Sequence, residues 1–182
     1  IAVGEVRLSH SQPTASAVLG LVAGSLGIKR SDEELLQRMA SDYGIAVREH
    51  TPGILLRDYH TVQTPQTSKK KALYTRKDEL SGDVNTLLST REYRNDAFYT
   101  IAVYPLLENS LYPLEKLKEA LDRPQFVPYL GRKSCTPALP FRSEVICAET
   151  LHSAFKSYHE LLMPMLDDLG FPSKVAVRPL PA

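Results

Sequence analysis

The sequence has no tryptophan, only two cysteines, and nine glycines in 182 residues. Cys135 and Cys147 lack the spacing of a zinc site and are too few for a disulfide framework, so we expect reduced thiols and no bound metal. The longest apolar run, 15–28, is interrupted by two serines and is shorter than the about 20 residues that cross a membrane. These absences predict a cytoplasmic protein with no membrane partner, and we expect no cofactor.

An excess of charge of one sign is also lacking, since 22 Lys and Arg against 21 Asp and Glu give a formal net charge of +1. Bulk charge therefore gives no argument for nucleic acid, and any anion site must come from local clusters. An apolar content of 43% and a charged content of 24% are typical of a folded protein. The length predicts one domain, spanning 1–182.

What is present predicts a mixture of helices and strands. Helices are expected over 14–26, from a capping box at Ser31 and Glu34 to 40, over 114–121 and over 150–162. Strands are expected over 44–47, 54–62, 87–93, 97–103 and 144–148, with a strand remnant within 1–8. A polar stretch, 63–85, is either a functional loop or the tip of a hairpin arm over 54–93. This order favours an α+β, ferredoxin-like domain with a protruding arm.

Two segments are candidate anion sites. The helix start at Thr14 and Ser16 offers free backbone N–H groups, and Arg7 lies just upstream. The loop Gly131-Arg132-Lys133-Ser134 combines a glycine, two cations and a hydroxyl, and Tyr129 beside it could stack on a base. A plain N-cap and a solvated basic loop are the alternatives. The loop lacks the P-loop spacing, so nucleotide hydrolysis is not supported.

The strand Arg57-Asp58-Tyr59-His60-Thr61 and the basic hairpin are further candidates. Asp58 and His60 share one face of the strand, and Arg57, Tyr59 and Thr61 share the other. His60 beside Tyr59 allows general acid–base chemistry, although a surface histidine is the simpler interpretation. The hairpin interleaves basic and aromatic residues: Lys69, Lys70, Lys71, Arg76, Lys77, Arg91, Tyr93 and Arg94. Such a pattern can bind a nucleic acid strand, and a solvated charged face is the alternative. No catalytic triad, paired-carboxylate site or dinucleotide fingerprint stands out.

Several short motifs occur together in one order: Pro13-Thr14-Ala15-Ser16-Ala17-Val18-Leu19-Gly20-Leu21, Gly24-Ser25-Leu26-Gly27-Ile28, Leu56-Arg57-Asp58-Tyr59-His60-Thr61-Val62, Arg91-Glu92-Tyr93 and Pro128-Tyr129-Leu130-Gly131-Arg132-Lys133-Ser134-Cys135. Each is weak alone, but five in register are specific. Over about 7–148 the sequence resembles the CasD, or "Cas-five", family of subunits of the type I-E CRISPR surveillance complex called Cascade.

The resemblance implies a ferredoxin-like core, similar to an RNA-recognition motif, with a β-hairpin thumb over about 60–92. It implies a non-catalytic subunit that caps the 5′ handle of the CRISPR RNA, contacts the backbone (Cas-seven) and large subunits, and meets target DNA through the complex in antiviral defence. The residues expected at the RNA are Arg7, Thr14, Ser16, His60, Thr61, Arg91, Tyr93, Tyr129, Arg132, Lys133 and Ser134. Gly20, Gly24 and Gly27 are expected to pack a helix tightly against the sheet.

The sequence departs from the family pattern at three places. Ala15 stands where the family usually has Lys or Arg, which removes one expected phosphate contact. The family's first strand and its basic C-terminal segment are not evident, so the chain resembles a trimmed copy of a longer protein. Two other functions stay open: a metal-independent endoribonuclease using Tyr59 or His60, as in a type I-C relative, and a pure protein-interaction module.

Overall fold

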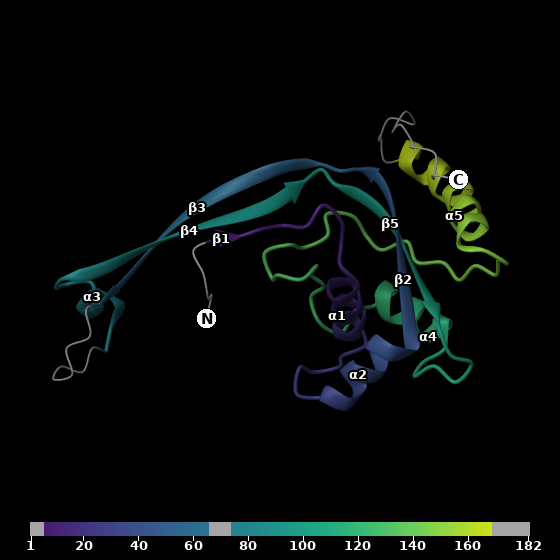
Figure 1. Ribbon diagram of the computed structural model, residues 1–182, viewed down its shortest axis with the longest axis horizontal. Helices are drawn as coiled ribbons and strands as arrows, with labels where there is room; N and C mark the ends of the chain where they lie inside the picture. The colour runs from purple at the N-terminus through teal and green to yellow at the C-terminus, as the bar shows by residue number, and fades with distance from the viewer. Residues whose placement is uncertain (1–5, 66–73, 169–182) are drawn as a thin grey trace. The chain divides into compact units, whose positions relative to one another are not determined.

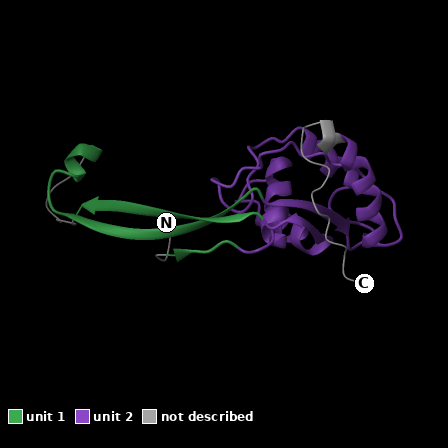
Figure 2. Ribbon diagram, turned by 90° about the horizontal axis from the view of Figure 1, so that it is seen from above, with its two compact units in different colours: residues 1–9, 53–96 green, residues 10–52, 97–182 purple. Residues whose placement is uncertain are grey.

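The computed structural model describes residues 6–65 and 74–168, which form two compact units coloured separately in Figure 2. Unit 1 comprises Ile1–Ser9 and Gly53–Asp96, and unit 2 comprises His10–Pro52 and Ala97–Ala182. Both helices and strands are present, in agreement with the α+β prediction. Three basic residues of the predicted hairpin, Lys69, Lys70 and Lys71, lie outside the described residues.

Unit 2 begins with helix α1, Ala15–Ser25, whose limits follow the predicted signals (Figure 1). Thr14 is the N-cap, and its hydroxyl accepts the Ala17 N–H at 3.3 Å. The helix ends at Leu26, and Gly27 takes a φ of 81°, which a glycine adopts without steric cost. A side chain at Gly27 would meet the side chain of Gln125, so this glycine is closely packed, but against a loop later in the chain and not against the sheet.

The other two helix glycines are not packed as expected. A Cβ atom built at Gly20 or Gly24 has no atom within 4 Å among the described residues, and Gly20 is exposed. The glycine face of α1 therefore does not pack tightly on a sheet of this unit. The prediction was wrong because glycine spacing shows which side of a helix is bare, not what lies against it.

Helix α2, Glu33–Asp42, confirms the second predicted helix but not its capping box. Its N-cap is Asp32 rather than Ser31, and no side chain caps it. The Asp32 carboxylate instead accepts the Lys29 N–H at 2.9 Å, and Ser31 donates to Asp32 at 3.2 Å. The Asp32 side chain therefore binds groups of the loop before the helix, and Asp32 takes the N-cap position that was predicted for Ser31. The helix starts one residue later as a result.

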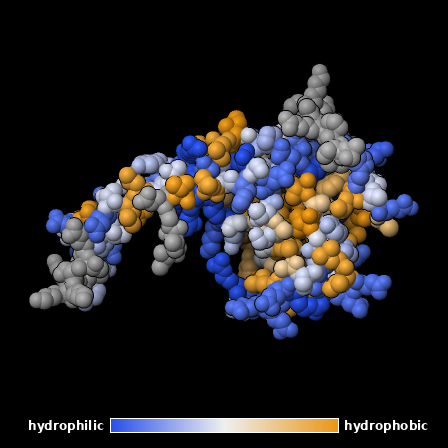
Figure 3. Space-filling model, viewed as in Figure 1, coloured by the Kyte–Doolittle hydropathy of each residue, from blue (hydrophilic) through white to orange (hydrophobic). Residues whose placement is uncertain are grey.

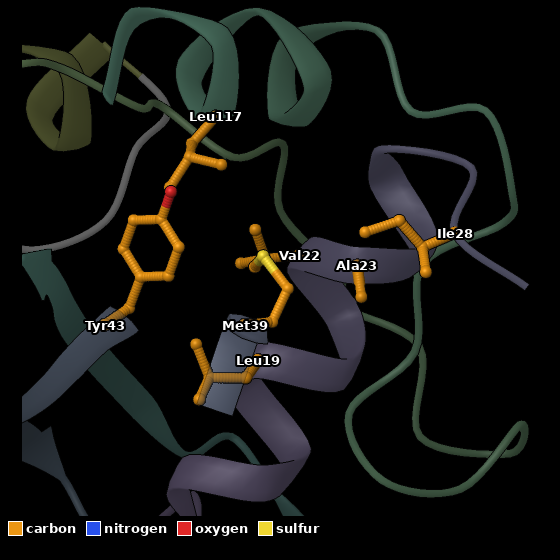
Figure 4. Packing of buried hydrophobic residues seen from close by; sticks show 7 residues of the cluster. All are labelled: Leu19, Val22, Ala23, Ile28, Met39, Tyr43 and Leu117. Carbon is orange, nitrogen blue, oxygen red and sulfur yellow. The ribbon is translucent and has the colours of Figure 1, made fainter. Parts of the chain in front are cut away.

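Strands β2, Tyr43–Thr51, and β5, Phe98–Pro105, form an antiparallel two-stranded sheet, with an irregularity between Glu49 and Thr51. Helix α4, Leu114–Asp122, begins after Pro113, as predicted. Side chains from α1, α2, α4, one face of β2 and the loop after α1 form the core: Leu19, Val22, Ala23, Ile28, Met39, Tyr43 and Leu117 (Figure 4). The Tyr43 hydroxyl accepts the Tyr112 N–H at 2.7 Å, so its polar atom is satisfied at the edge of this core.

Helix α5, Leu151–Asp168, packs against the opposite face of β2 and β5. The buried Arg48 donates to the Phe155 carbonyl at 3.4 Å, and the buried His50 contacts Thr100 at 2.7 Å. The His50 ring stacks on that of His159, with 6.1 Å between centroids. Burial, followed by the charge of Arg48 and the neighbouring His159, lowers the pKa of His50 to about 4. This side of the sheet therefore combines polar contacts with buried apolar side chains of α5, Phe155 and Leu162.

The predicted strand over 144–148 is wrong, because these residues have no regular secondary structure and pair with no strand in the described chain. Val145 is 41% exposed, so the apolar run that suggested a strand does not mark a fully buried segment. Helix α5 also continues past the predicted end at 162 and contains Pro164.

Unit 1 is a three-stranded sheet of order β1-β4-β3, built on a long hairpin. Strand β3, Ile54–Pro65, pairs antiparallel with β4, Val84–Asn95, without a register shift. The short strand β1, Val6–Arg7, pairs parallel with β4 and confirms the predicted strand remnant. A four-residue helix, α3, Arg76–Glu79, lies in the predicted polar stretch between the two long strands.

The described part of unit 1 has no buried hydrophobic residue. The one buried residue of this described part is Glu92. Its carboxylate forms an ion pair with the Arg57 Nε atom at 3.0 Å and accepts a hydrogen bond from the Ser9 N–H at 3.3 Å. Many of its large apolar side chains are exposed, including Val6, Leu8, Ile54, Leu56, Tyr59, Val62, Leu87 and Leu88. Figure 3 shows apolar residues along the hairpin surface among hydrophilic ones. The described part of the unit is therefore held by its backbone ladder and by polar contacts to one buried carboxylate, to which the exposed Arg57 is paired.

Candidate nucleic-acid interface

Strand pairing brings two predicted arginines together in unit 1. Arg7 pairs with Arg91 across β1 and β4, and Arg91 pairs with Asp58 across β4 and β3. Directly paired residues point to the same face of a sheet, so the three side chains form one row across it. The Arg91 Nε atom is buried and has no hydrogen-bond partner among the described residues. Two arginines in one row, one of them with a buried Nε that has no partner in the described chain, offer hydrogen-bond donors to an anion.

His60 lies on this face, two residues from Asp58 along β3. Its Nε2 atom is 2.6 Å from the Asp58 Oδ2 atom. The two atoms are in contact but not aligned for a straight hydrogen bond, because Nε2 is buried without a well-directed acceptor. No functional role was assigned to Asp58 from the sequence. Its spacing of two residues from His60 was the signal that could have identified it, because that spacing places both side chains on one face of the strand.

Tyr93 lies on the same face, because it is two residues from Arg91 along β4 and pairs with Leu56, which is two residues from Asp58 along β3. It stands on the side of the arginine row away from His60. Thr61 does not join it. Thr61 pairs with Leu88 and lies on the opposite face. The structure therefore brings Arg7, His60, Arg91 and Tyr93 to one surface and leaves Thr61 on the other; we call this surface the Arg91 face.

The opposite face of the unit 1 sheet has a different character. It holds the Arg57–Glu92 ion pair beside a shallow hollow of about 430 Å³, lined by Val6, Leu8, Tyr59 and Thr90 among others. Tyr59 is 64% exposed there. Because Tyr59 and His60 project to opposite faces of β3, they do not form one acid–base site.

The second group of predicted residues lies in unit 2, where two distant segments meet. A Cβ atom built at Gly131 would lie 3.6 Å from the Ala17 Cβ atom, so the loop over 129–135 lies against the start of α1. The Thr14 and Ser16 hydroxyls are 3.2 Å apart at that start. The first N–H groups of a helix have no partner within the helix, and they carry the positive end of its dipole.

The loop itself has a defined backbone. The Arg132 N–H donates to the Leu130 carbonyl at 2.9 Å around Gly131, whose φ is 75°. This is a γ-turn geometry that strongly favours glycine. The Leu130 N–H donates to the Cys135 carbonyl, and the Cys135 N–H to the Arg132 carbonyl, each at 2.8 Å. The loop therefore presents Arg132, Lys133 and Ser134 from a closed turn; we call this loop and the start of α1 the Gly131 surface.

Other chemistry is not assembled in the described residues. No group of three or more His, Cys, Asp or Glu side chains converges there as a metal site, and Cys135 and Cys147 are free thiols. Within the same part of the chain, no helix is long and apolar enough to span a membrane. What the geometry offers is two surfaces of backbone amides, hydroxyls, cations and aromatic rings.

The sequence model of the family described as CRISPR-associated protein (Cas_Cas5) matches residues 2–177. The chain belongs to this family. A curated relative, the CRISPR system Cascade subunit CasD of Escherichia coli (strain K12), is 34% identical over 132 residues. This match covers 68% of the chain and 54% of the relative. The resemblance inferred from the motifs is thereby confirmed.

Two solved structures share the fold of this Cas5 chain. One, described as a CRISPR RNA-guided surveillance complex, has a TM-score of 0.54 at 27% identity and covers 75% of this chain and 53% of its own. The other, described as the crystal structure of a Cas protein, has a TM-score of 0.52 at 27% identity and covers 82% and 58%. The chain therefore spans just over half the length of the relatives that it matches.

Proposed function

We propose that this Cas5 chain is a non-catalytic RNA-binding subunit of a type I-E Cascade complex, which caps the 5′ handle of the CRISPR RNA. In this proposal both units belong to one ferredoxin-like domain, and the β3–β4 hairpin is its thumb. Its partners are the CRISPR RNA, the backbone Cas-seven-type subunit and the large subunit, and it meets target DNA through the complex.

The observation that carries the proposal is the Gly131 surface. Residues separated by more than a hundred positions meet there, and each contributes groups suited to a phosphate backbone: the start of α1, the Arg132 and Lys133 cations and the Ser134 hydroxyl. Tyr129 stands beside them as a stacking platform. The Arg91 face adds two paired guanidinium groups and Tyr93. Both surfaces combine backbone contacts with stacking, which is how single-stranded RNA is recognised.

Purification with bound RNA tests the proposal directly. The tagged chain is expressed with its genomic neighbours and a CRISPR array, and the RNA that accompanies it is sequenced. We expect uniform RNAs with one repeat-derived 5′ end in a large particle. A free protein, or a protein carrying random fragments, would contradict the proposal and favour the protein-interaction alternative.

The salt dependence of RNA binding tests the Gly131 surface itself. Each phosphate neutralised on a single strand contributes about −0.7 to the slope of log K against log salt, so Arg132→Ala with Lys133→Ala should flatten the slope by about 1.4. Lys29→Ala with Arg30→Ala, which removes the same charge from an exposed segment, is the matched control. An unchanged slope in the first variant, or an equal change in both, would remove Arg132 and Lys133 from the interface.

One observation keeps the endoribonuclease alternative testable. The His60–Asp58 contact on the Arg91 face could serve proton transfer near two arginines. If the chain cuts precursor RNA, His60→Ala abolishes processing. If it is a handle-binding subunit, processing continues and only RNA binding or assembly weakens.

A further inference from the structure

The outer edge of β3 is open to a further strand. In the sheet order β1-β4-β3 it has one neighbour, and no strand of the described chain pairs with its other side. Folded proteins commonly block such an edge with a bulge, a lysine or a proline. The pairing of β3 with β4 has no register shift, and Ile54–Pro65 contains no lysine and has its proline at the last position. Helix α3 covers the end of the edge, where Arg76 donates to the Gln63 carbonyl. The edge is therefore a template for one further strand over 54–62.

A second copy of this chain fits the edge, because the sequence of β3 is complementary to itself. When a two-fold axis relates two antiparallel strands, one residue lies opposite its own counterpart, and directly opposed side chains share a face. With Tyr59 on the axis, residues at equal distances on either side of it oppose one another. Leu56 then lies opposite Val62 of the second copy. Asp58 lies opposite its His60, and both contacts occur twice.

The contacts of this register match in chemistry. Leu56 and Val62 are both exposed in the single chain and would cover each other. The Asp58 carboxylate accepts hydrogen bonds, and an imidazole such as that of His60 has an N–H donor in either protonation state. Tyr59, which is 64% exposed, would pack against its own counterpart.

Charge disfavours the neighbouring symmetric registers. Moving the axis one residue toward the N-terminus places two Asp58 carboxylates opposite each other, and moving it two residues does the same to the Arg57 guanidinium groups. Like charges directly opposite each other destabilise a strand pair. Moving the axis to His60 places Asp58 opposite Val62 and leaves the carboxylate without a donor. The sequence of the strand therefore selects the register with Tyr59 on the axis.

We infer that the chain, when free of RNA and of other subunits, forms a symmetric dimer in which two β3 strands pair antiparallel about Tyr59. The pairing joins the unit 1 sheets of the two copies into one sheet. The contact is only one strand wide, so the dimer is weak and reversible. It also closes on itself, so association stops at two copies. The inference does not rest on the proposed function.

Sedimentation velocity of the full chain over a range of concentrations measures the dimer, and two variants test its register. Leu56→Glu and Val62→Lys each place a charge opposite an apolar side chain at both contacts. Each should raise the dissociation constant roughly 3- to 30-fold. An equimolar mixture of the two variants should form a heterodimer, because the new carboxylate of one faces the new ammonium group of the other. The chain that carries both changes should recover the homodimer for the same reason.

Leu87→Lys is the matched control for Val62→Lys. Leu87 is exposed and pairs with Val62 on the same face, but it lies on β4 and not at the open edge. This variant should change the dissociation constant by less than about 2-fold and should not form a heterodimer with Leu56→Glu. Circular dichroism confirms that each variant is folded.

Three results would overturn the inference. The first is a chain that stays monomeric at about 0.1 mM, which would leave the edge for an extended segment of a different protein. The second is a dimer that Leu56→Glu and Leu87→Lys weaken equally. The third is a mixture of Leu56→Glu and Val62→Lys that pairs no better than either variant alone, because the register about Tyr59 requires these positions to meet.

Discussion

The two units of the chain are stabilised in opposite ways. Unit 2 buries side chains from three helices and a strand around Met39, which is only 1% exposed. Unit 1 has no buried apolar residue in its described part and surrounds one buried carboxylate, Glu92, with polar partners. A two- or three-stranded sheet without an apolar layer is marginally stable alone. The contrast indicates that the fold of the chain depends on unit 2, whereas the exposed side chains of unit 1 are available for contacts.

The largest expected difference comes from truncating one apolar side chain in each unit. Met39→Ala should lower the free energy of unfolding by roughly 2–5 kcal/mol, because it leaves a cavity in the core. Leu87→Ala, at a residue that is 59% exposed, should change it by about 0.5 kcal/mol or less. Urea unfolding followed by circular dichroism measures both. Equal losses would show that unit 1 also depends on apolar packing.

The next effect concerns the polar side of unit 2 and depends on pH. The pKa of His50 lies near 4 against an ordinary 6.5, so below pH 6.5 the unfolded chain binds more protons than the folded one. The wild type should therefore lose roughly 1–3 kcal/mol as the pH falls from 6.5 to about 4. His50→Gln should lose less, and the residual loss includes His159, whose pKa burial also lowers. His152→Gln, at an exposed position of α5, should behave as the wild type, and identical pH profiles for all three would contradict the assignment.

A smaller effect is expected from the buried carboxylate of unit 1. Glu92→Gln keeps an acceptor for Ser9 but removes the charge opposite Arg57, which should cost about 1 kcal/mol. The loss should be local, since it affects β1 and β4 rather than the core. Hydrogen exchange of the β1 and β4 amides measures it, with Asp83→Asn at an exposed hairpin position as control. A fall in the protection of α1 would mean that the units unfold together.

The smallest effect has the opposite sign. Gly20→Ala should stabilise the isolated chain by about 0.5–1 kcal/mol, because Gly20 is helical and a methyl group there meets nothing within 4 Å. Gly27→Ala should destabilise it, because Gly27 has a positive φ and its open side is filled by Gln125. Thermal unfolding compares the two. Stabilisation by both would contradict the described packing of this helix end.

Local signals in the sequence predicted most of the helices and strands. Thr14 and Pro113 mark helix starts through their own side chains, and Gly27 marks a helix end through its backbone. The errors arose where the outcome depends on competition or on a partner. Asp32 displaced Ser31 as the N-cap, and the apolar segment over 144–148 has no strand to pair with in the described chain.

The candidate site was predictable as residue types but not as surfaces. Arg7 and Arg91 are 84 positions apart in sequence, and only the pairing of β1 with β4 places them together. The opposite faces of His60 and Thr61 were predictable from strand alternation, but which of the two faces carries the arginine row depends on the pairing of β4 with both β1 and β3. The approach of Gly131 to Ala17 likewise depends on tertiary packing, which sequence periodicity does not encode.

The hairpin has a consequence for how this chain can change over generations. All twelve residues of β3 pair with the twelve of β4, and the ladder uses backbone atoms that every residue except proline supplies. Replacing one exposed apolar side chain of the hairpin therefore alters what the arm touches without unfolding the protein. We therefore expect exposed positions of the hairpin to tolerate substitution better than the core positions of unit 2 on which the fold depends.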